Sequence, residues 1–364
     1  MRMARAAVLE EYGRLVLRSF PVPDPGPEEA LLRVELAGVC GTDPKVFHGQ
    51  LCQAELPIIL GHEILGRIEA IGEAAAERTG VGVGDRVTVE ASVGCGACAL
   101  CRRGAPRFCR RVIDYGVRIS AARPPHLLGA FAEYLFLLPH TSMHKIPDDL
   151  PARGAVMLNA VLSNGIQWVK LQGGARPGDA VVIQGAGQQA LACTIAAKEC
   201  GAAPIVVCGL RRDAERLALA REFGADATVI AEEENLAGLV ADLTHGEGAD
   251  LVVEVTGDPA ALAAALHLLR PQGTLVHAGV TGDGVLTQLP LDVVLFKELR
   301  IQGVFSKGSE AILAAIDLLA SRRYAVERMI SRVYPLAEAE TAVRAAGNEL
   351  PDFYPIKVAV DPWL

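Results

Sequence analysis

The pattern of apolar and polar positions divides the chain into two parts. Up to about Pro151, short apolar runs are bounded by Gly, Pro and Asp, and helical periodicity is weak. Such runs are typical of strands. They are Leu15–Leu17, Ala30–Leu36, Ile64–Ile71 and Arg86–Val89. The first part is therefore predicted to be mostly β.

Beyond Pro151, apolar runs alternate with longer amphipathic segments. The predicted strands are Ala180–Ile183, Pro204–Val207, Leu251–Val255 and Thr274–Ala278. The predicted helices are Ala190–Glu199, Arg212–Phe223 and Pro259–Leu269. This alternation predicts βαβ units and a parallel sheet. The chain ends with helices predicted around 310–320 and 336–346 and a final strand at Ile356–Val360.

Composition narrows the class of protein. A chain of 364 residues exceeds the size at which a single core stops growing, so two domains are expected. A net charge of -8 argues against a nucleic-acid partner, which would need a clustered basic face. There is no apolar stretch long enough to span a membrane, and the opening residues lack the apolar core of a signal peptide. We therefore expect a cytoplasmic protein without a membrane partner.

Four of the nine cysteines lie close together in the chain. Cys95, Cys98, Cys101 and Cys109 have the spacing C-x2-C-x2-C-x7-C. Four thiolates at such spacing can surround one Zn²⁺ tetrahedrally and leave no position for a substrate, as in a structural site. An iron–sulfur cluster, two disulfides and free thiols are the alternatives; zinc is favoured.

A second set of possible metal ligands lies upstream. The segment GVCGTD contains Cys40, Thr42 and Asp43, and the segment GHEILGRIEAIG contains His62 and Glu63. A thiolate with an imidazole suits zinc. Either residue alone is more often a small core residue or a structural histidine.

Together, these motifs resemble those of the zinc-containing medium-chain alcohol dehydrogenases. The pattern G-H-E-x2-G-x5-G is matched in full from Gly61 to Gly72, and the other motifs follow in the family's order over the whole chain. The resemblance implies an α/β protein with two domains. A GroES-like, β-rich catalytic domain would comprise 1–157 and 299–364, with a structural zinc lobe at 94–110. A Rossmann domain with a doubly wound parallel sheet would comprise 158–298 and bind the coenzyme.

The resemblance also implies roles for single residues. Cys40 and His62 would bind a catalytic zinc, and Glu63 would be a ligand or a near neighbour of the metal. Thr42 would bond the substrate hydroxyl and pass its proton on, and Asp43 would orient the ligating histidine, although an aspartate here can also cap a turn. With one catalytic and one structural ion, two Zn²⁺ per chain are expected.

The sequence departs from the family pattern at the third protein ligand. Counting back from Gly165, the slot falls on Ala160, with Asn159 beside it, and neither is anionic. Three explanations are open: Glu63 ligates together with water, Cys52 enters from a loop, or the catalytic zinc is weak or absent. The first is favoured.

A second departure is Lys45, where many relatives have a proton-relaying histidine. Lys45 would assist proton transfer, bind an anionic group of the substrate, or simply be a solvated lysine. His48 is a possible substitute in the relay, although a surface histidine is the simpler interpretation.

A glycine-rich turn follows the first strand of the second part. In QGAGQQALA, Gly185 and Gly187 match the first two glycines of G-x-G-x-x-G and Ala190 takes the third place. The glycines permit the tight turn and the approach of a pyrophosphate to the helix N-terminus, with Gln188 and Gln189 in the turn. Thr256 and Gly279 close later strands and are predicted by the resemblance to line the rest of the coenzyme site.

The end of the next strand bears on the choice of coenzyme. Gly209 occupies the slot where NAD enzymes usually carry an acid, and Arg211 and Arg212 follow. Guanidinium groups can pair with a 2′-phosphate, which favours NADP over NAD. The opposing interpretation has the arginines in solvent at a helix start, with Asp213 as a cap or a ribose contact.

The predicted function is that of a zinc-dependent alcohol or polyol dehydrogenase, or ketone reductase, which transfers hydride between an alcohol carbon and a nicotinamide coenzyme. The substrate would be a small alcohol or ketone, and the chain would form a homodimer or homotetramer. Two alternatives remain: an enoyl or quinone reductase of the same superfamily, and a nucleotide-binding redox sensor without catalysis.

Overall fold

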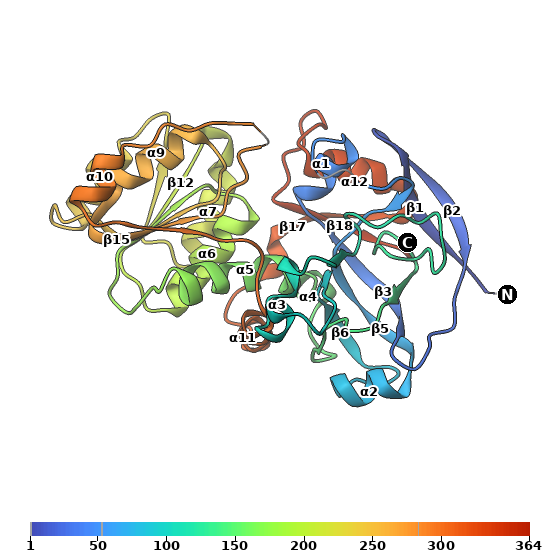
Figure 1. The fold of residues 1–364 in the computed structure, drawn as a ribbon. Coiled ribbons are helices and arrows are strands. Elements are labelled where there is room, and N and C mark those ends of the chain that lie inside the picture. The colour runs from blue at the N-terminus through green and yellow to red at the C-terminus, as the bar shows by residue number, and fades with distance from the viewer. Residues whose placement is uncertain (1, 52–53, 283) are drawn as a thin grey trace. The chain divides into compact units, whose positions relative to one another are not determined.

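The computed structural model describes residues 2–51, 54–282 and 284–364, so Cys52 lies outside the described residues. The chain forms two compact units. The first unit is Met1–Asn159 with Ile316–Leu364, and the second is Ala160–Ala315. Figure 1 shows the blue and red ends of the chain folded into the same unit.

The first unit is built on mostly antiparallel sheets. Its strands are β1(Met3–Glu11), β2(Arg14–Pro21), β3(Ala30–Val39), β4(Ile58–Ile59), β5(Glu63–Ile71), β6(Arg86–Val89), β7(Ser92–Val93), β8(Ile113–Asp114), β9(Tyr134–Leu137), β10(Met143–Lys145), β17(Ile330–Pro335) and β18(Lys357–Asp361). The larger sheet has the order β10-β6-β5-β3-β18-β17, with β9 also paired to β3, and a smaller one has the order β2-β1-β4. The C-terminal strand β18 thus pairs with β3, near the beginning of the chain.

Short helices and 3-10 turns connect these strands. They are α1(Thr42–Phe47), α2(Glu73–Thr79), α3(Ala99–Arg102), η1(Pro106–Phe108), α4(Ala152–Ala155), η5(Val326–Met329), η6(Leu336–Glu338) and α12(Ala339–Ala346). The core between the sheets is apolar and includes the fully buried Leu32, Ile64 and Phe131. Strand β3 is buried along most of its length because it lies inside the sheet, which explains its nearly continuous apolar sequence.

The second unit contains one parallel sheet. Its strands are β11(Val181–Gln184), β12(Ile205–Gly209), β13(Ala227–Ile230), β14(Ala249–Glu254), β15(Leu269–His277) and β16(Arg300–Gly303). They lie in the order β13-β12-β11-β14-β15-β16 and all pair in parallel. The order reverses between β11 and β14, which is the switch point of a doubly wound Rossmann sheet.

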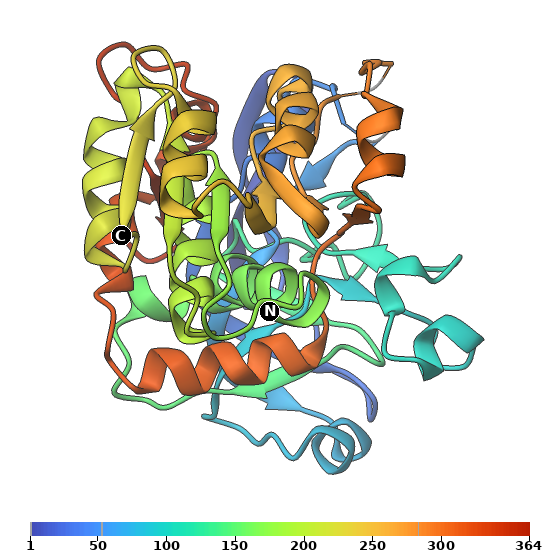
Figure 2. The same ribbon diagram turned by 90° about the vertical axis from the view of Figure 1, so that its left-hand side faces the viewer.

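Helices connect and cover this sheet (Figures 1 and 2). They are η2(Leu158–Leu162), α5(Ser163–Gly165), η3(Ile166–Gln172), α6(Gln188–Glu199), η4(Arg211–Asp213), α7(Ala214–Glu222), α8(Leu236–Leu243), α9(Pro259–Leu268) and α10(Leu291–Phe296), of which η2 and η3 are π-helical. Helix α11(Ser309–Ala320) begins in the second unit and ends in the first. The predicted α/β class with a parallel sheet is confirmed, and each strand and helix predicted for this part overlaps an observed one.

The end of the second unit differs from the boundary expected at 298. Strand β16 pairs in parallel with β15 from Thr274↔Arg300 to His277↔Gly303, so the parallel sheet extends past that boundary. The compact second unit continues to Ala315. The sequence pattern missed β16 because the strand is short and lies at an edge, where its side chains are mostly exposed.

Among the helices of the described residues, none is both long enough and apolar enough to cross a membrane.

Candidate zinc and coenzyme sites

The four cysteines of 94–110 converge in the first unit. Cys98 Sγ lies 3.5 Å from Cys101 Sγ and 3.8 Å from Cys109 Sγ, and Cys95 Sγ lies 4.0 Å from Cys101 Sγ. All four sulfur atoms lie within 4.8 Å of one another. A tetrahedron with Zn–S bonds of about 2.3 Å has S···S edges of about 3.8 Å, so the group fits one zinc ion. The four cysteines are free, and their separations exceed the roughly 2.05 Å of a disulfide.

The local electrostatics also favour a bound cation. The backbone N–H of Ala97 and the guanidinium of Arg111 help to lower the pKa of Cys95 to about 5. Burial, followed by the neighbouring thiol of Cys98, raises the pKa of Cys101 to about 11. Four thiolates this close repel one another, and a divalent cation removes that repulsion.

Cys40, His62 and Glu63 form a second group in the same unit. Their ligand atoms all lie within 4.8 Å of one another. Cys40 follows strand β3, while His62 and Glu63 stand at the start of β5, and β3 and β5 pair antiparallel. The pairing of these two strands therefore brings together residues that are separate in sequence.

Asp43 holds this group in place. Its side chain is 1% exposed, and Oδ2 accepts a hydrogen bond of 2.7 Å from the backbone N–H of Cys40. Its Oδ1 lies 3.4 Å from Nδ1 of His62. Because Nδ1 faces Asp43, Nε2 of His62 remains for a metal, which is a common arrangement of a ligating histidine. Asp43 thus bonds the turn at Cys40 and faces the ring of His62.

The protonation of His62 depends on the same neighbours. Burial favours the neutral ring, but the carboxylate of Asp43 and then the thiol group of Cys40 outweigh it and raise the pKa of His62 well above its ordinary value. The pocket therefore stabilises positive charge. A soft thiolate, an imidazole and a carboxylate together are a suitable donor set for Zn²⁺.

Glu63 makes a contact that the sequence analysis did not include. Its Oε2 lies 2.5 Å from Nζ of Lys357, and both side chains are fully buried. Lys357 also donates to the backbone carbonyl of Val39 at 3.2 Å. Among the described residues, Oε1 of Glu63 has no hydrogen-bond donor, so this oxygen is the one left for a metal. No local signal marks Lys357, which reaches the site from the C-terminal strand β18.

The two residues at the expected slot for a third ligand, Asn159 and Ala160, both bond within the protein. Asn159 is 1% exposed, and its Nδ2 donates to the carbonyls of Val89 at 2.7 Å and His62 at 3.2 Å. The carbonyl of Ala160 instead accepts from Asn164 and Gln189, each at 2.8 Å. Asn159 therefore contacts the backbone of the candidate ligand His62.

Three further predicted residues have clear positions. Thr42 begins α1, and its Oγ1 lies 3.8 Å from Cys40 Sγ, so its hydroxyl is close to the candidate ligands. Nε2 of His48 lies 2.7 Å from a carboxylate oxygen of Glu349, so this ring contacts the segment after α12. Lys45 is partly buried on α1.

In the second unit, the glycine-rich turn has the geometry of a phosphate-binding turn. Gly185 has a φ of +120°, which favours glycine, and a Cβ there would meet Val255 at 2.9 Å. A Cβ on Gly187 would meet nothing within 4 Å, so the turn is open on that side. Gly187 is the N-cap of α6 and supplies no side-chain cap, which leaves the first N–H groups of the helix available for an anion.

The predicted glutamines differ in their environment. Gln189 donates from Nε2 to Ala160, and its Oε1 accepts from Asn164, so its side chain is used within the fold. The Oε1 of Gln188 is buried and has no hydrogen-bond donor among the residues that the structure describes.

Glu254 joins the two later turns. Its Oε1 accepts from the backbone N–H groups of Thr256 at 2.6 Å and Gly257 at 2.9 Å, and also from the hydroxyl of Thr256. Its Oε2 lies 3.2 Å from Nδ1 of His277, and Gly279 packs so closely that a Cβ there would contact this oxygen at 2.7 Å. Glu254 is 0% exposed, so a buried carboxylate fixes both turns.

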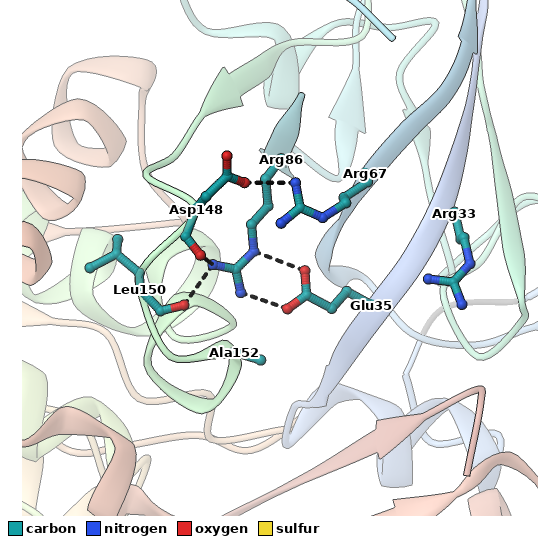
Figure 3. Close-up of a pocket in the computed structure, with 7 residues that line it drawn as sticks. All are labelled: Arg33, Glu35, Arg67, Arg86, Asp148, Leu150 and Ala152. Carbon is teal, nitrogen blue, oxygen red and sulfur yellow. Dashed lines mark hydrogen bonds and ion pairs between the residues drawn. The ribbon is translucent and has the colours of Figure 1, made fainter. Parts of the chain in front are cut away.

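A separate polar pocket in the first unit has a structural role. It is lined by Arg33, Glu35, Arg67, Arg86, Asp148, Leu150 and Ala152. Figure 3 shows the guanidinium of Arg86 held by both carboxylate oxygens of Glu35, at 2.6 and 2.8 Å, and by the carbonyl of Leu150. Arg67 is paired with Asp148 at 2.6 Å. These donors bond to the protein itself, so the pocket fastens the segment around 148–150 to the sheet.

The comparisons with known proteins agree with this arrangement. Residues 26–148 match the family model of the alcohol dehydrogenase GroES-like domain, and residues 190–321 match that of the zinc-binding dehydrogenase. The chain belongs to the zinc-containing medium-chain alcohol dehydrogenase family. It is accordingly an oxidoreductase, a zinc-dependent alcohol or polyol dehydrogenase with a GroES-like and a Rossmann domain.

Individual relatives are similar over nearly the whole chain. A probable alcohol dehydrogenase of Mycobacterium tuberculosis is 40% identical over 99% of both chains. The erythritol/L-threitol dehydrogenase of Mycolicibacterium smegmatis is 33% identical over 92% of both. Among solved structures, an alcohol dehydrogenase from Thermotoga maritima is 28% identical with a TM-score of 0.90, covering 99% of this chain and 100% of that one. A protein from Sinorhizobium meliloti, described as a zinc-binding dehydrogenase bound to NADP, is 30% identical with a TM-score of 0.87 over 100% of both.

Proposed function

We propose that Cys40, His62 and Glu63 hold the catalytic zinc, and that the substrate is a small alcohol or polyol or the corresponding ketone. The observation that carries this proposal is the convergence of a thiol, an imidazole and a buried carboxylate within 4.8 Å. Zinc at this position would act as a Lewis acid toward the substrate oxygen. The names of relatives that act on erythritol and D-xylulose support a polyol.

The chain's own residues have separate tasks in this proposal. Asp43 keeps the ring of His62 turned so that Nε2 is free, and it fixes the backbone of Cys40. The hydroxyl of Thr42 bonds to the substrate oxygen and accepts or returns its proton. Lys357 holds one oxygen of Glu63 and leaves the other to complete the ligand set.

Four thiolates, those of Cys95, Cys98, Cys101 and Cys109, hold a second zinc with a structural role, which makes two ions per chain. The S···S separations of 3.5–4.0 Å support this proposal. All four positions around this ion are filled by sulfur, so it takes no part in the reaction.

The second unit binds the nicotinamide coenzyme. Its pyrophosphate would rest on the open N–H groups at the start of α6, between Gly185 and Gln188, while the turns at Thr256 and Gly279 would line the remainder. Arg211 and Arg212 after β12 favour NADP(H) over NAD(H). The NADP bound to the Sinorhizobium meliloti protein supports this choice.

The second unit also supports a homodimer or homotetramer. Strand β16 is an edge strand of the parallel sheet, with Ile301 exposed on it. Helix α10 exposes Leu291, Leu295 and Phe296, which gives the unit a large apolar surface. A cytoplasmic location is in keeping with the eight cysteines among the described residues, all of which are free.

Zinc content and turnover of variants test this proposal. We expect two zinc ions per chain in the purified protein and one in C40A, with turnover of alcohols and polyols lost and coenzyme binding, followed by fluorescence, retained. The matched control is C200A, at the half-buried end of α6 and outside both cysteine groups, which should keep two ions and full activity. A C40A protein that keeps both ions and its turnover would refute the assignment.

A further inference from the structure

Three consecutive glutamates, Glu232, Glu233 and Glu234, follow strand β13 in the second unit. The backbone N–H groups of Glu233 and Glu234 both donate to the carbonyl of Ile230 at 2.9 Å, so the segment folds back tightly. The N–H of Ala231 donates to the carbonyl of Gly209 at 2.9 Å. These bonds fix the acidic segment beside the carboxyl end of β12.

Two of these glutamates bind Arg211. Oε2 of Glu232 accepts a hydrogen bond of 2.9 Å from the backbone N–H of Arg211, and Oε1 of Glu233 lies 2.7 Å from its Nε. The guanidinium that the sequence assigns to a 2′-phosphate is therefore already paired with a carboxylate. The side chains of Arg211 and Glu233 are 73% and 43% exposed, and such exposed pairs are weak enough to exchange partners.

No carboxylate of β12 or of the turn after it is free to replace these glutamates. A Cβ on Gly209 would lie 2.9 Å from the Cβ of Ala186, so the backbone is too crowded there for a larger side chain. Asp213 is buried, where it accepts from the N–H of Leu210 at 2.9 Å and pairs with Arg216 at 3.0 Å. The carboxylates that bind Arg211 thus come from the segment after the neighbouring strand β13.

We infer that Glu233, supported by Glu232, is a specificity-determining residue for the coenzyme and restrains the preference for NADP. This inference rests on the proposed function, in which the adenosine ribose lies beyond the carboxyl end of β12, as in other Rossmann domains. A 2′-phosphate carries about -1.5 to -2 charges, must displace Glu233 from Arg211, and meets three carboxylates nearby. A neutral 2′-hydroxyl meets no such repulsion and can donate to a carboxylate.

Coenzyme binding by variants tests the inference without relying on turnover. We expect E233Q to bind NADPH about tenfold more tightly than the unaltered protein in fluorescence titrations, because it frees one charge-assisted partner of the phosphate. Its affinity for NADH should fall or stay within about twofold. The matched control is E247Q, which removes an exposed glutamate elsewhere on the same unit and should change neither affinity.

A double-variant cycle tests whether Glu233 acts through Arg211. In the R211Q background, E233Q should lose most of its effect on NADPH, because the shared guanidinium is gone. An E233Q protein with unchanged NADPH affinity, or with equal gains for both coenzymes, would overturn the inference while leaving the proposed function intact. If the unaltered protein binds neither coenzyme, the proposed function and the inference both fail.

Discussion

The ion pair between Glu63 and Lys357 allows a quantitative prediction. Both side chains are fully buried, and the charged atoms are 2.5 Å apart. With an effective dielectric constant near 20, their attraction is about 7 kcal/mol. The substitution K357M fills a similar volume but leaves the carboxylate of Glu63 buried without its cation. Removing one partner of a buried pair costs roughly 3–5 kcal/mol.

We therefore expect K357M to lose about 3–5 kcal/mol of stability at pH 7 in the metal-free protein. This corresponds to a fall in Tm of roughly 6–20 °C for a unit of this size.

Thermal unfolding followed by circular dichroism, with and without zinc, measures these differences. The double variant E63Q/K357M should recover most of the loss, since no buried charge remains. K145M is the matched control, because Lys145 pairs with Asp85 at 2.9 Å on the surface. Losing this pair should lower the free energy of unfolding by less than about 1 kcal/mol. If Glu63 binds zinc, added zinc should raise the Tm of K357M more than that of the unaltered protein. A metal-free K357M that melts within about 2 °C of the unaltered protein at pH 7 would refute the reasoning.

Two further predictions concern the second unit. E254Q weakens the carboxylate acceptor shared by the N–H groups of Thr256 and Gly257. We therefore expect the dissociation constant for NADH to rise about tenfold in a fluorescence titration, while the zinc content stays unchanged. An unaltered dissociation constant would contradict this role of Glu254. Burial, followed by the carboxylates of Glu232 and its neighbour Glu234, raises the pKa of Cys208 to about 11. At pH 8 only about one Cys208 thiol in a thousand is then ionised. Mass spectrometry after brief iodoacetamide treatment should therefore find Cys208 unmodified in the folded protein. Rapid alkylation of Cys208 would argue against its buried, acidic surroundings.

The sequence predicted the features that depend on neighbouring residues. After Pro151, the alternation of apolar runs with amphipathic segments predicted the parallel strands. Strands and helices space their apolar residues at different intervals along the chain, so each type can be recognised locally. The cysteine spacing predicted a compact group of thiols, since three of the four are separated by only two residues and must lie close together. The glycine turn before α6 was likewise predictable, because the φ of +120° at Gly185 is one that glycine adopts readily.

The details of the candidate site were harder to predict. Asn159 donates to the carbonyls of His62 and Val89, two contacts across the fold that no local pattern in the sequence indicates. Arg211 appeared available for a 2′-phosphate, but it is paired with Glu233, which lies in the turn after the neighbouring strand β13. Strand β16 carried too few buried apolar residues to be recognised.

The sequence by itself thus determined the class of fold, the cysteine group, the coenzyme turn and the likeness to zinc-containing alcohol dehydrogenases, because each depends on residues close together in the chain. The tertiary structure decided which charges meet. Lys357 reaches Glu63 only because β18 pairs with β3, and Glu233 reaches Arg211 only because β13 pairs with β12. The stability of a buried or shared charge depends on the charged group beside it. The pairing of strands that are distant in sequence decides which group that is.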